Sequence, residues 1–202
     1  MRKKNIFLLE NIPWGRSNAA DGVKGLPHLL FVGNLNYNPN LEGLQHFVRH
    51  VWPCILERHP EARLQIVGDY PAGHPTVECL IAAPGIDLLG RVETLAHFYH
   101  SARFAICPVY WGGGTKIKVL ESLSFGKAIV VSSHAFSGYE ARLEDQESIV
   151  VAYTDEAFCQ ACVRLLVDDS FREKLERNGK RVCDQYFSFD AFKEQFFKVL
   201  VQ

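Results

Sequence analysis

The chain has 202 residues, of which 48% are hydrophobic, and its 22 Lys and Arg against 23 Asp and Glu give a formal net charge of -1. A chain of this length can bury a sizeable core in one domain or slightly more. The balanced charge gives no general attraction to nucleic acid or to an anionic membrane surface, so we predict no nucleic-acid partner and only a local anion site. No stretch of the sequence approaches the roughly 18 apolar residues of a membrane span.

The N-terminal segment and the cysteines suggest a cytoplasmic protein. Residues 1–27 contain a basic start, an apolar run too short for a signal peptide, and several prolines and glycines, so we predict a linker there and one domain over 28–202. Six irregularly spaced cysteines in a chain this large predict reduced thiols. Cys159 and Cys162 form a C-x-x-C without a second pair that would complete a zinc site, which favours core packing.

Short apolar runs and helical patterns alternate along the domain. The runs rich in branched residues predict buried strands at 29–33, 64–68, 86–90, 104–108, 128–132 and 148–152. Between them, helices are predicted from Pro39 onward with Asn38 as the cap, over 93–102, and over 115–125 with Gly126 as the stop. This alternation predicts an α/β fold, a Rossmann-like open parallel sheet with helices on both faces.

The last fifty residues predict a C-terminal helical tail. Apolar positions at helical spacing predict helices over 155–167 and 188–200, and Ser170 to Glu173 has the pattern of a capping box at the start of another helix. The final helix carries several phenylalanines, more apolar surface than the edge of an isolated domain needs.

Two loops lie where an open parallel sheet binds ligands, outside the carboxyl ends of its strands. They are G-N-L-N-Y-N-P-N at 33–40 and W-G-G-G-T-K at 111–116. Glycines let the second loop approach a ligand closely, and a helix that begins near Thr115 points free N–H groups at an anion, with Lys116 and Lys118 adding charge. The alternative is a loose loop with solvated lysines. The order Gly-Thr-Lys excludes a P-loop, and neither loop has the G-x-G-x-x-G pattern.

Glu121 falls in the second turn of the helix that follows the glycine loop, among apolar residues. A carboxylate there is partly desolvated and needs hydrogen-bond donors. One interpretation is an ion pair with Lys118, which would stabilise the helix only weakly. The functional interpretation is a carboxylate that accepts two vicinal ribose hydroxyls, while the start of the same helix holds the diphosphate.

From about Pro27 to the C-terminus, these segments resemble the C-terminal, donor-binding domain of GT-B glycosyltransferases, in the large retaining group called group 1. FVGNLNYNPN resembles the family's first strand and glycine turn, LQIVG its second strand, and LLGRVETLAHFYHSARFAICPVY the stretch that follows. GGGTKIKVLESLSFGKAIVVS resembles the Glu-x7-Glu helix and the Gly-Lys-Pro-Val-Val after it, with Ala128 in place of the proline. Glu121 matches the second glutamate, which binds the ribose hydroxyls in that family.

The resemblance implies a function for the whole family domain. The donor would be a nucleoside-diphosphate sugar, transferred as a hexosyl group with retention to a glycan or lipid-linked acceptor, without a metal or other cofactor. The implied donor-binding residues are Gly33, Asn34, Arg91, Val92, Gly112, Gly113, Gly114, Thr115, Lys116 and Glu121. Arg91 and Val92 would lie at the nucleobase, where a plain surface arginine is the alternative. The resemblance also implies a bacterial cytoplasmic enzyme of polysaccharide biosynthesis, with room for peripheral association of the full enzyme at the inner face of the membrane.

Three departures from the family pattern qualify this expectation. Gly113 stands where the family's first glutamate contacts the donor hexose. Asn34 and Pro39 fall near the family's Arg and Lys that hold the diphosphate, and we expect Lys116, together with Lys118, to replace that charge. The N-terminal domain, which in this family supplies the acceptor site and most catalytic groups, has no room in 202 residues. We therefore assign no catalytic residue and expect one half of a GT-B fold, inactive alone.

Other interpretations of the chain stay open at this point. The runner-up is a non-catalytic module that binds a nucleotide or a partner subunit, and a nucleotide-sugar epimerase with a related sheet is a third class. Tyr110 and Trp111 fit either a wall of the base or sugar site or core packing. His97, His100 and His134 receive no catalytic role, and His134 is expected to be a solvated loop residue.

Overall fold

The computed structural model describes residues 27–200, without the side chains of Gln195, Lys198, Val199 and Leu200. Apart from Pro27, the linker predicted for residues 1–27 lies outside this described part. Six parallel strands form one sheet: β1 (His28–Val32), β2 (Arg63–Val67), β3 (Ile86–Gly90), β4 (Phe104–Cys107), β5 (Ile129–Ser132) and β6 (Val150–Ala152). All six predicted strands are confirmed, because branched and aromatic residues buried on both faces favour the centre of a parallel sheet.

The strand order is β3-β2-β1-β4-β5-β6. The chain starts in the middle of the sheet, builds outward to β3, and then returns to the other side of β1 to build outward to β6. Leu29 of β1 therefore has Leu64 of β2 on one side and Phe104 of β4 on the other. The gap between β1 and β4, where the direction of building reverses, is the topological switch point of the sheet.

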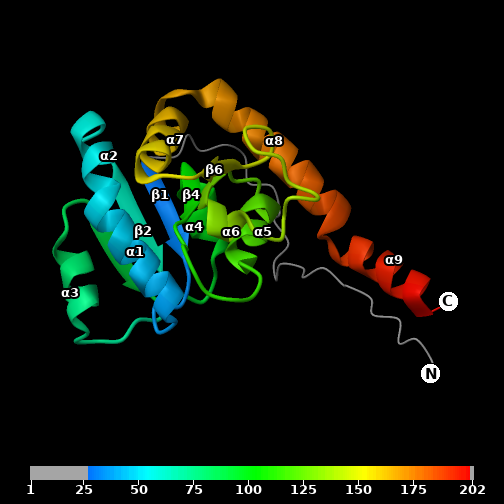
Figure 1. Cartoon of the computed structure of the whole chain (residues 1–202), viewed down its shortest axis with the longest axis horizontal. Coiled ribbons are helices and arrows are strands. Elements are labelled where there is room, and N and C mark those ends of the chain that lie inside the picture. The colour runs from blue at the N-terminus through cyan, green and yellow to red at the C-terminus, as the bar shows by residue number, and fades with distance from the viewer. Residues whose placement is uncertain (1–26, 201–202) are drawn as a thin grey trace.

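Helices cover both faces of this sheet (Figure 1). They are α1 (Asn38–His50), α2 (Trp52–Arg58), α3 (Pro75–Ala82), α4 (Ala96–Ser101), α5 (Ile117–Ser124), α6 (Ser133–Phe136), α7 (Asp155–Val167), α8 (Asp169–Tyr186) and α9 (Phe189–Leu200). Alternate strand residues build two cores. Leu29 and Phe31 pack in the core with α1, α2, α3 and α7, and Leu30 packs in the other core with α4, α5, α6 and α8.

Several helix boundaries differ from those predicted. The N-cap of α1 is Tyr37, without a side-chain capping bond, and Asn38 is already helical. The cap of α8 is Asp168, which accepts a hydrogen bond from the backbone N–H of Phe171 at 2.9 Å, so the capping box at Ser170 is wrong. The helix predicted over 93–102 is shorter in the structure, where it is α4 (Ala96–Ser101). The short helices α2, α3 and α6 were not predicted, because a helix of so few turns shows no clear helical period in the sequence.

The end of α5 follows the predicted form. Gly126 has a φ of +67°, and its N–H donates to Leu123 O at 2.9 Å while the next N–H, that of Lys127, donates to Ser122 O at 3.0 Å. This pair of bonds is the Schellman motif, which a glycine at C′ allows without a steric penalty. The prediction that Gly126 stops the helix is confirmed.

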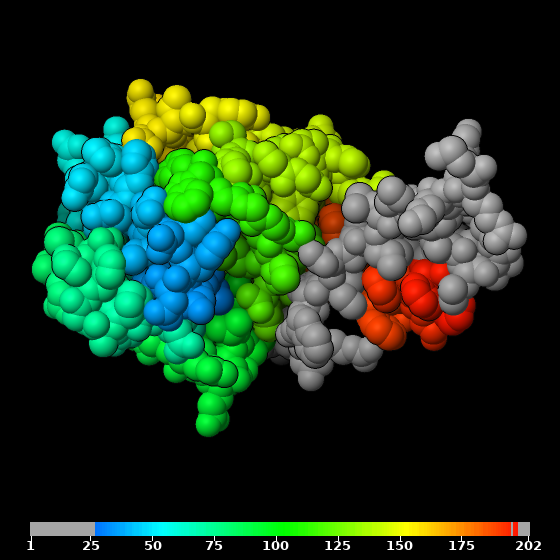
Figure 2. Space-filling model, turned by 60° about the horizontal axis from the view of Figure 1, so that its bottom comes forward, coloured from blue at the N-terminus to red at the C-terminus, as the bar shows by residue number. Residues whose placement is uncertain are grey.

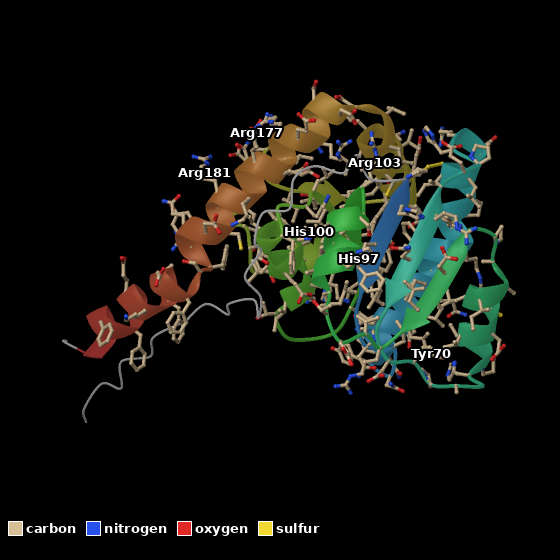
Figure 3. All side chains as sticks on the ribbon, turned by 180° about the vertical axis from the view of Figure 1, so that it is seen from behind. Tyr70, His97, His100, Arg103, Arg177 and Arg181 are labelled. Atoms are coloured by element: carbon tan, nitrogen blue, oxygen red, sulfur yellow. A yellow bond between two sulfur atoms is a disulfide. The ribbon has the colours of Figure 1, made fainter. Side chains whose placement is uncertain are left out.

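The prediction of reduced thiols is wrong for two of the six cysteines. A disulfide joins Cys54 of α2 to Cys159 of α7, with their Cα atoms 6.2 Å apart (Figure 3). Because 105 residues separate the two positions, only the packing of α2 against α7 brings the sulfurs together. Cys162, the other cysteine of the C-x-x-C pair, is buried in the core as predicted.

The last helix, α9, extends away from the sheet beyond α8 (Figure 1). Phe189 and Phe197 expose more than half of their surface, which agrees with the predicted excess of apolar surface on this helix. On α8, the side chains of Arg177 and Arg181 point outward, away from the sheet (Figure 3). Within residues 27–200, no helix combines the length and the hydropathy that a membrane crossing requires.

Candidate functional site

A pocket of about 280 Å³ opens at the switch point, at the carboxyl ends of β1 and β4. Its walls come from the segment after β1 and from the glycine loop and first turns of α5. The lining residues are Val32, Gly33, Tyr37, Asn40, Val109, Trp111, Gly113, Thr115, Lys116, Ile117, Lys118 and Glu121. Figure 2 turns this edge of the sheet forward. The surface of the segment after β1, in blue, lies next to the green surface of the chain around the glycine loop.

Asn40 joins the two sides of the pocket. Its side-chain Nδ2 donates to Asn34 O at 2.8 Å, and its Oδ1 accepts from Lys118 Nζ at 2.6 Å. Asn40 is buried, with 8% of its surface exposed, so both of its amide groups need these partners. A Cβ at Gly33 would lie only 2.7 Å from Lys118 Nζ and 3.0 Å from Asn40 Nδ2, so a side chain at this position would displace the two groups that form the junction.

The ammonium of Lys118 lies in a desolvated position. It sits 4.2 Å from the centroid of the Phe31 ring, and burial lowers the pKa of the amine, while the nearby Cys107 and Glu121 raise it. Among the described residues, no carboxylate forms an ion pair with Lys118 within 4.0 Å. A partly buried cation held by a neutral amide is favourable for an incoming anion, because the anion supplies the missing counter-charge.

Glu121 lies one turn after Lys118 on α5. Its Oε2 accepts a hydrogen bond from the hydroxyl of Tyr99 at 3.0 Å. Burial raises the pKa of the carboxyl group, while the hydrogen bond from Tyr99 and the charge of Lys118 lower it. The carboxylate is therefore poised to accept hydrogen bonds from hydroxyl groups of a ligand, which would replace the water that burial removed.

The glycine loop adopts a backbone that only glycine tolerates well. Gly112 and Gly114 have φ angles of +100° and +79°, and a Cβ at Gly112 would lie 2.7 Å from Pro39 Cγ. Gly113, between them, has open space where its side chain would be. The glycine loop thus packs against the start of α1 on one side and exposes its middle residue to the pocket.

Three side chains hold the backbone carbonyls of this loop. Ser132 donates to Val109 O, His134 Nε2 lies 2.8 Å from Gly112 O, and Tyr139 donates to Lys116 O at 3.0 Å. The expectation that His134 is a solvated loop residue is wrong, because it lies on α6 against this carbonyl. The pairing of these carbonyls favours an ordered loop over the loose one that was the alternative.

Two aromatic residues form the rim of the pocket. Tyr37 and Trp111 each expose 47% of their surface, and the indole Nε1 of Trp111 donates to Glu42 Oε2 at 2.9 Å. The hydroxyl of Tyr37 donates to Gly113 O at 3.4 Å, so the rim also connects the two loops. The rim therefore presents two half-exposed aromatic rings to the pocket.

The predicted site residues divide into two groups. Gly33, Gly113, Thr115, Lys116 and Glu121 line the pocket, and Gly112 and Gly114 flank its lining residue Gly113. Outside the lining, Asn34 is an exposed turn residue whose Oδ1 accepts from the backbone N–H of Asn36 at 2.8 Å.

Arg91 and Val92 also lie outside the pocket lining. The side chain of Arg91 is 82% exposed, 3.9 Å from Asp69, and Val92 packs against one of the cores.

Sequence reasoning missed three contributors to the site. Asn40 carries the junction between the loops, Tyr37 forms part of the rim, and Tyr99 reaches Glu121 from another helix. The density of asparagines in 33–40 was a usable signal for Asn40, because a buried amide needs partners on both of its ends. Tyr99 had no local signal, since 22 residues separate it from Glu121.

The fold and the site define a Rossmann-like α/β protein with its pocket at the topological switch point, the usual ligand position in such sheets. The family follows from the sequence: residues 26–168 match the family model of glycosyl transferases group 1. The chain belongs to this family, which confirms the resemblance drawn from its motifs.

Known relatives agree with this assignment. An uncharacterized glycosyltransferase of Methanocaldococcus jannaschii, MJ1607, is 30% identical over 205 aligned positions, which cover 95% of this chain and 48% of the relative. TarM of S. aureus, in complex with Fondaparinux, alpha-GlcNAc-glycerol and UDP, superposes with a TM-score of 0.81 at 11% identity, over 100% of this chain and 41% of TarM. Anabaena HepE, in complex with UDP and glucose, superposes with a TM-score of 0.70 at 14% identity, over 90% of this chain and 50% of HepE.

These likenesses confirm the predicted fold class, one Rossmann-like half of a GT-B fold. At these low identities the solved structures show the fold alone. The chain spans about half the length of the relatives that it matches.

Proposed function

We propose that this domain binds a nucleoside-diphosphate sugar as the donor for retaining glycosyl transfer to a glycan or lipid-linked acceptor. One observation carries the proposal: α5 presents the partly buried ammonium of Lys118 and the carboxylate of Glu121 one turn apart, in a pocket at the switch point. A nucleoside diphosphate offers the complementary groups, since its pyrophosphate is an anion and its ribose has two vicinal hydroxyls. The UDP named in the TarM and HepE complexes supports this choice of ligand class.

In this proposal the pyrophosphate lies over the start of α5. The N-cap of this helix, Lys116, makes no side-chain capping bond. The N–H groups of Ile117 and Val119 already donate to Thr115 O and Lys116 O, so the helix contributes mainly its positive dipole end to the binding of the pyrophosphate. Lys118 contributes a charge-assisted hydrogen bond, and Lys116 a further one from the loop. Glu121 accepts the ribose hydroxyls, and no metal or other cofactor is required.

The hexose would lie toward Gly113 and Trp111 at the rim. Because Gly113 replaces a carboxylate of the family motif, recognition of the sugar would depend on loop backbone groups and on the half-exposed Trp111. The acceptor site and the remaining catalytic groups would belong to a further domain, which agrees with the span of about half the length of the relatives.

The alternative is a non-catalytic module that binds the nucleotide through the same pocket. Both functions require nucleotide binding, and only the first requires transfer. Sugar transfer by the 202-residue chain joined to an acceptor domain would distinguish the two.

Binding of uridine, UMP and UDP to matched lysine variants tests the role of the phosphates. Lys118→Met keeps the volume of the side chain over Phe31 but removes its charge, so we expect UDP binding to weaken by about 10- to 100-fold, the range of a lost charged hydrogen bond. Uridine binding should change little. Lys116→Ala should show the same preference, because Lys116 also lines the pocket.

Isothermal titration calorimetry on folded protein measures these affinities. Lys174→Met is the matched control, since Lys174 pairs with Glu147 on the surface and does not line the pocket. Equal losses for UDP and uridine in Lys118→Met, or no loss for either, would contradict the phosphate assignment.

A further inference from the structure

Tyr99, on helix α4, contacts the pocket residue Glu121 from the core side. Its hydroxyl donates to Glu121 Oε2 at 3.0 Å, and only 1% of its surface is exposed. The Tyr99 ring stacks on the ring of Phe125 with the centroids 4.7 Å apart and 10° between the planes. Figure 3, which views the molecule from behind, labels His97 and His100 of the same helix. Tyr99 is therefore a core residue whose polar end reaches the pocket carboxylate.

The stacking fixes where this hydroxyl can point. A tyrosine ring held between apolar neighbours has little rotational freedom, and a buried O–H is costly unless it has an acceptor. The acceptor here is one carboxylate oxygen of Glu121. None of the described residues donates a hydrogen bond to the other oxygen, Oε1, although Glu121 lines the pocket.

The surroundings of Glu121 contain few other charged groups. Lys118 lies on the same helix, and Cys107 of β4 is close to both Tyr99 and Lys118. Burial raises the pKa of the Glu121 carboxyl group, and the hydrogen bond from Tyr99 and the charge of Lys118 oppose that effect. Burial and the adjacent carboxylate also raise the pKa of Tyr99 well above its ordinary value, so its hydroxyl stays protonated and remains a donor.

We propose that Tyr99 is a positioning residue of the donor site: it holds one oxygen of Glu121 from the core side so that the other faces the ligand as an acceptor. This inference rests on the proposed function, in which Glu121 binds the ribose hydroxyls. Tyr99 does not line the pocket and acts through Glu121. The hydrogen bond both selects the rotamer of the carboxylate and favours its charged form, the form that accepts two hydroxyl groups.

The first test needs no ligand. Tyr99→Phe keeps the stacked ring and removes only the hydroxyl, so the Glu121 carboxyl group should titrate at a higher pH than in the wild type. NMR observation of the side-chain carboxyl carbons of glutamates over a pH series measures this shift. A structural role of the ring would leave the titration unchanged, and an unchanged titration would overturn the proposal.

The second test compares UDP with 2′,3′-dideoxy-UDP, which lacks the ribose hydroxyls. The wild type should prefer UDP, and in Tyr99→Phe this preference should fall by about 10-fold, the size of one hydrogen bond to a charged group. Tyr186→Phe, which removes a hydroxyl on α8 outside the pocket, is the matched control and should keep the preference. In a Glu121→Gln background, Tyr99→Phe should cause no further loss of preference.

The two tests separate the two claims. A wild type that binds UDP and the dideoxy analogue equally would overturn the ribose assignment of the proposed function. A wild type that prefers UDP, with Tyr99→Phe preferring it to the same degree, would overturn only the role of Tyr99. Thermal unfolding of each variant shows that the comparison is made on folded protein, and the carboxyl titration gives an answer even if no nucleotide binds.

Discussion

At the scale of single residues, the site contains ionisable groups whose charged forms are destabilised by burial. Burial raises the pKa of Glu121 and lowers that of Lys118, and both effects oppose the charged forms that a nucleotide would need. Such groups reduce the stability of the free protein, and a bound ligand compensates by supplying the missing partners. A site of this kind is the usual place where function costs stability.

Glu121→Gln tests this trade-off through its dependence on pH. Because the folded-state pKa of Glu121 is raised, its contribution to stability is greatest below the ordinary carboxyl pKa and is lost as the pH rises through the folded-state value. Glutamine can still accept the hydrogen bond from Tyr99 without a charge. We therefore expect the variant to be at least as stable as the wild type at pH 7 and to lose this pH dependence, while UDP binding weakens by about 1–3 kcal/mol.

Urea unfolding at several pH values and calorimetry with UDP measure the two effects. Lower stability of Glu121→Gln than of the wild type at pH 7 would show that the carboxylate stabilises the folded state. Unchanged UDP affinity in a folded variant would show that the carboxylate does not contribute to UDP binding.

The predicted residues at the pocket are those with a local signal in the sequence. A carboxylate in an apolar helix and three adjacent glycines are unusual within a few positions, so Glu121 and the glycine loop could be found without a structure. Asn40 and Tyr99 could not, because their roles come from contacts across the sheet that no short window contains. The same reason explains why the disulfide between Cys54 and Cys159 was missed.

At the scale of elements, the strands were predicted more accurately than the helices. Strands at the centre of a parallel sheet are buried on both faces and give continuous apolar runs, whereas α2, α3 and α6 have too few turns to show a period. The element that matters most for the site is the glycine loop between β4 and α5. Its conformation depends on Gly112, whose positive φ and contact with the start of α1 leave no room for a side chain.

Gly112→Ala and Gly113→Ala form a matched pair for this loop. A Cβ at Gly112 would meet Pro39 Cγ at 2.7 Å and would require a positive φ, so we expect a loss of about 1–3 kcal/mol in unfolding free energy. A Cβ at Gly113 would meet nothing within 4 Å, so the change in stability should stay within about 0.5 kcal/mol. Chemical denaturation compares the two, and equal stability would contradict the fixed loop.

At the scale of the whole molecule, the switch point determines where the parts of the site meet. The reversal between β1 and β4 places the segment after β1 beside the glycine loop, although more than 70 residues separate Gly33 from Gly113. A parallel sheet with helices on both faces could be expected from the alternation of strands and helices, but the order of the strands and the junction at Asn40 could not. The exposed phenylalanines of α9 and the span of about half the length of the relatives are consistent with a partner domain, which the proposed transfer reaction requires.

The most direct test of the donor-binding function is phosphorus NMR of UDP-glucose mixed with the purified 202-residue chain, with GDP-glucose and ADP-glucose in parallel. Binding shifts or broadens the two pyrophosphate resonances, and transfer or hydrolysis releases a nucleoside diphosphate with its own resonances. We expect at least one donor to bind, with modest affinity, and to stay intact when acceptor sugars are added, because the acceptor site and the remaining catalytic groups are proposed to lie in another domain. Unperturbed resonances for all three donors would contradict donor binding by this pocket, and acceptor-dependent release of the diphosphate would contradict the requirement for a second domain.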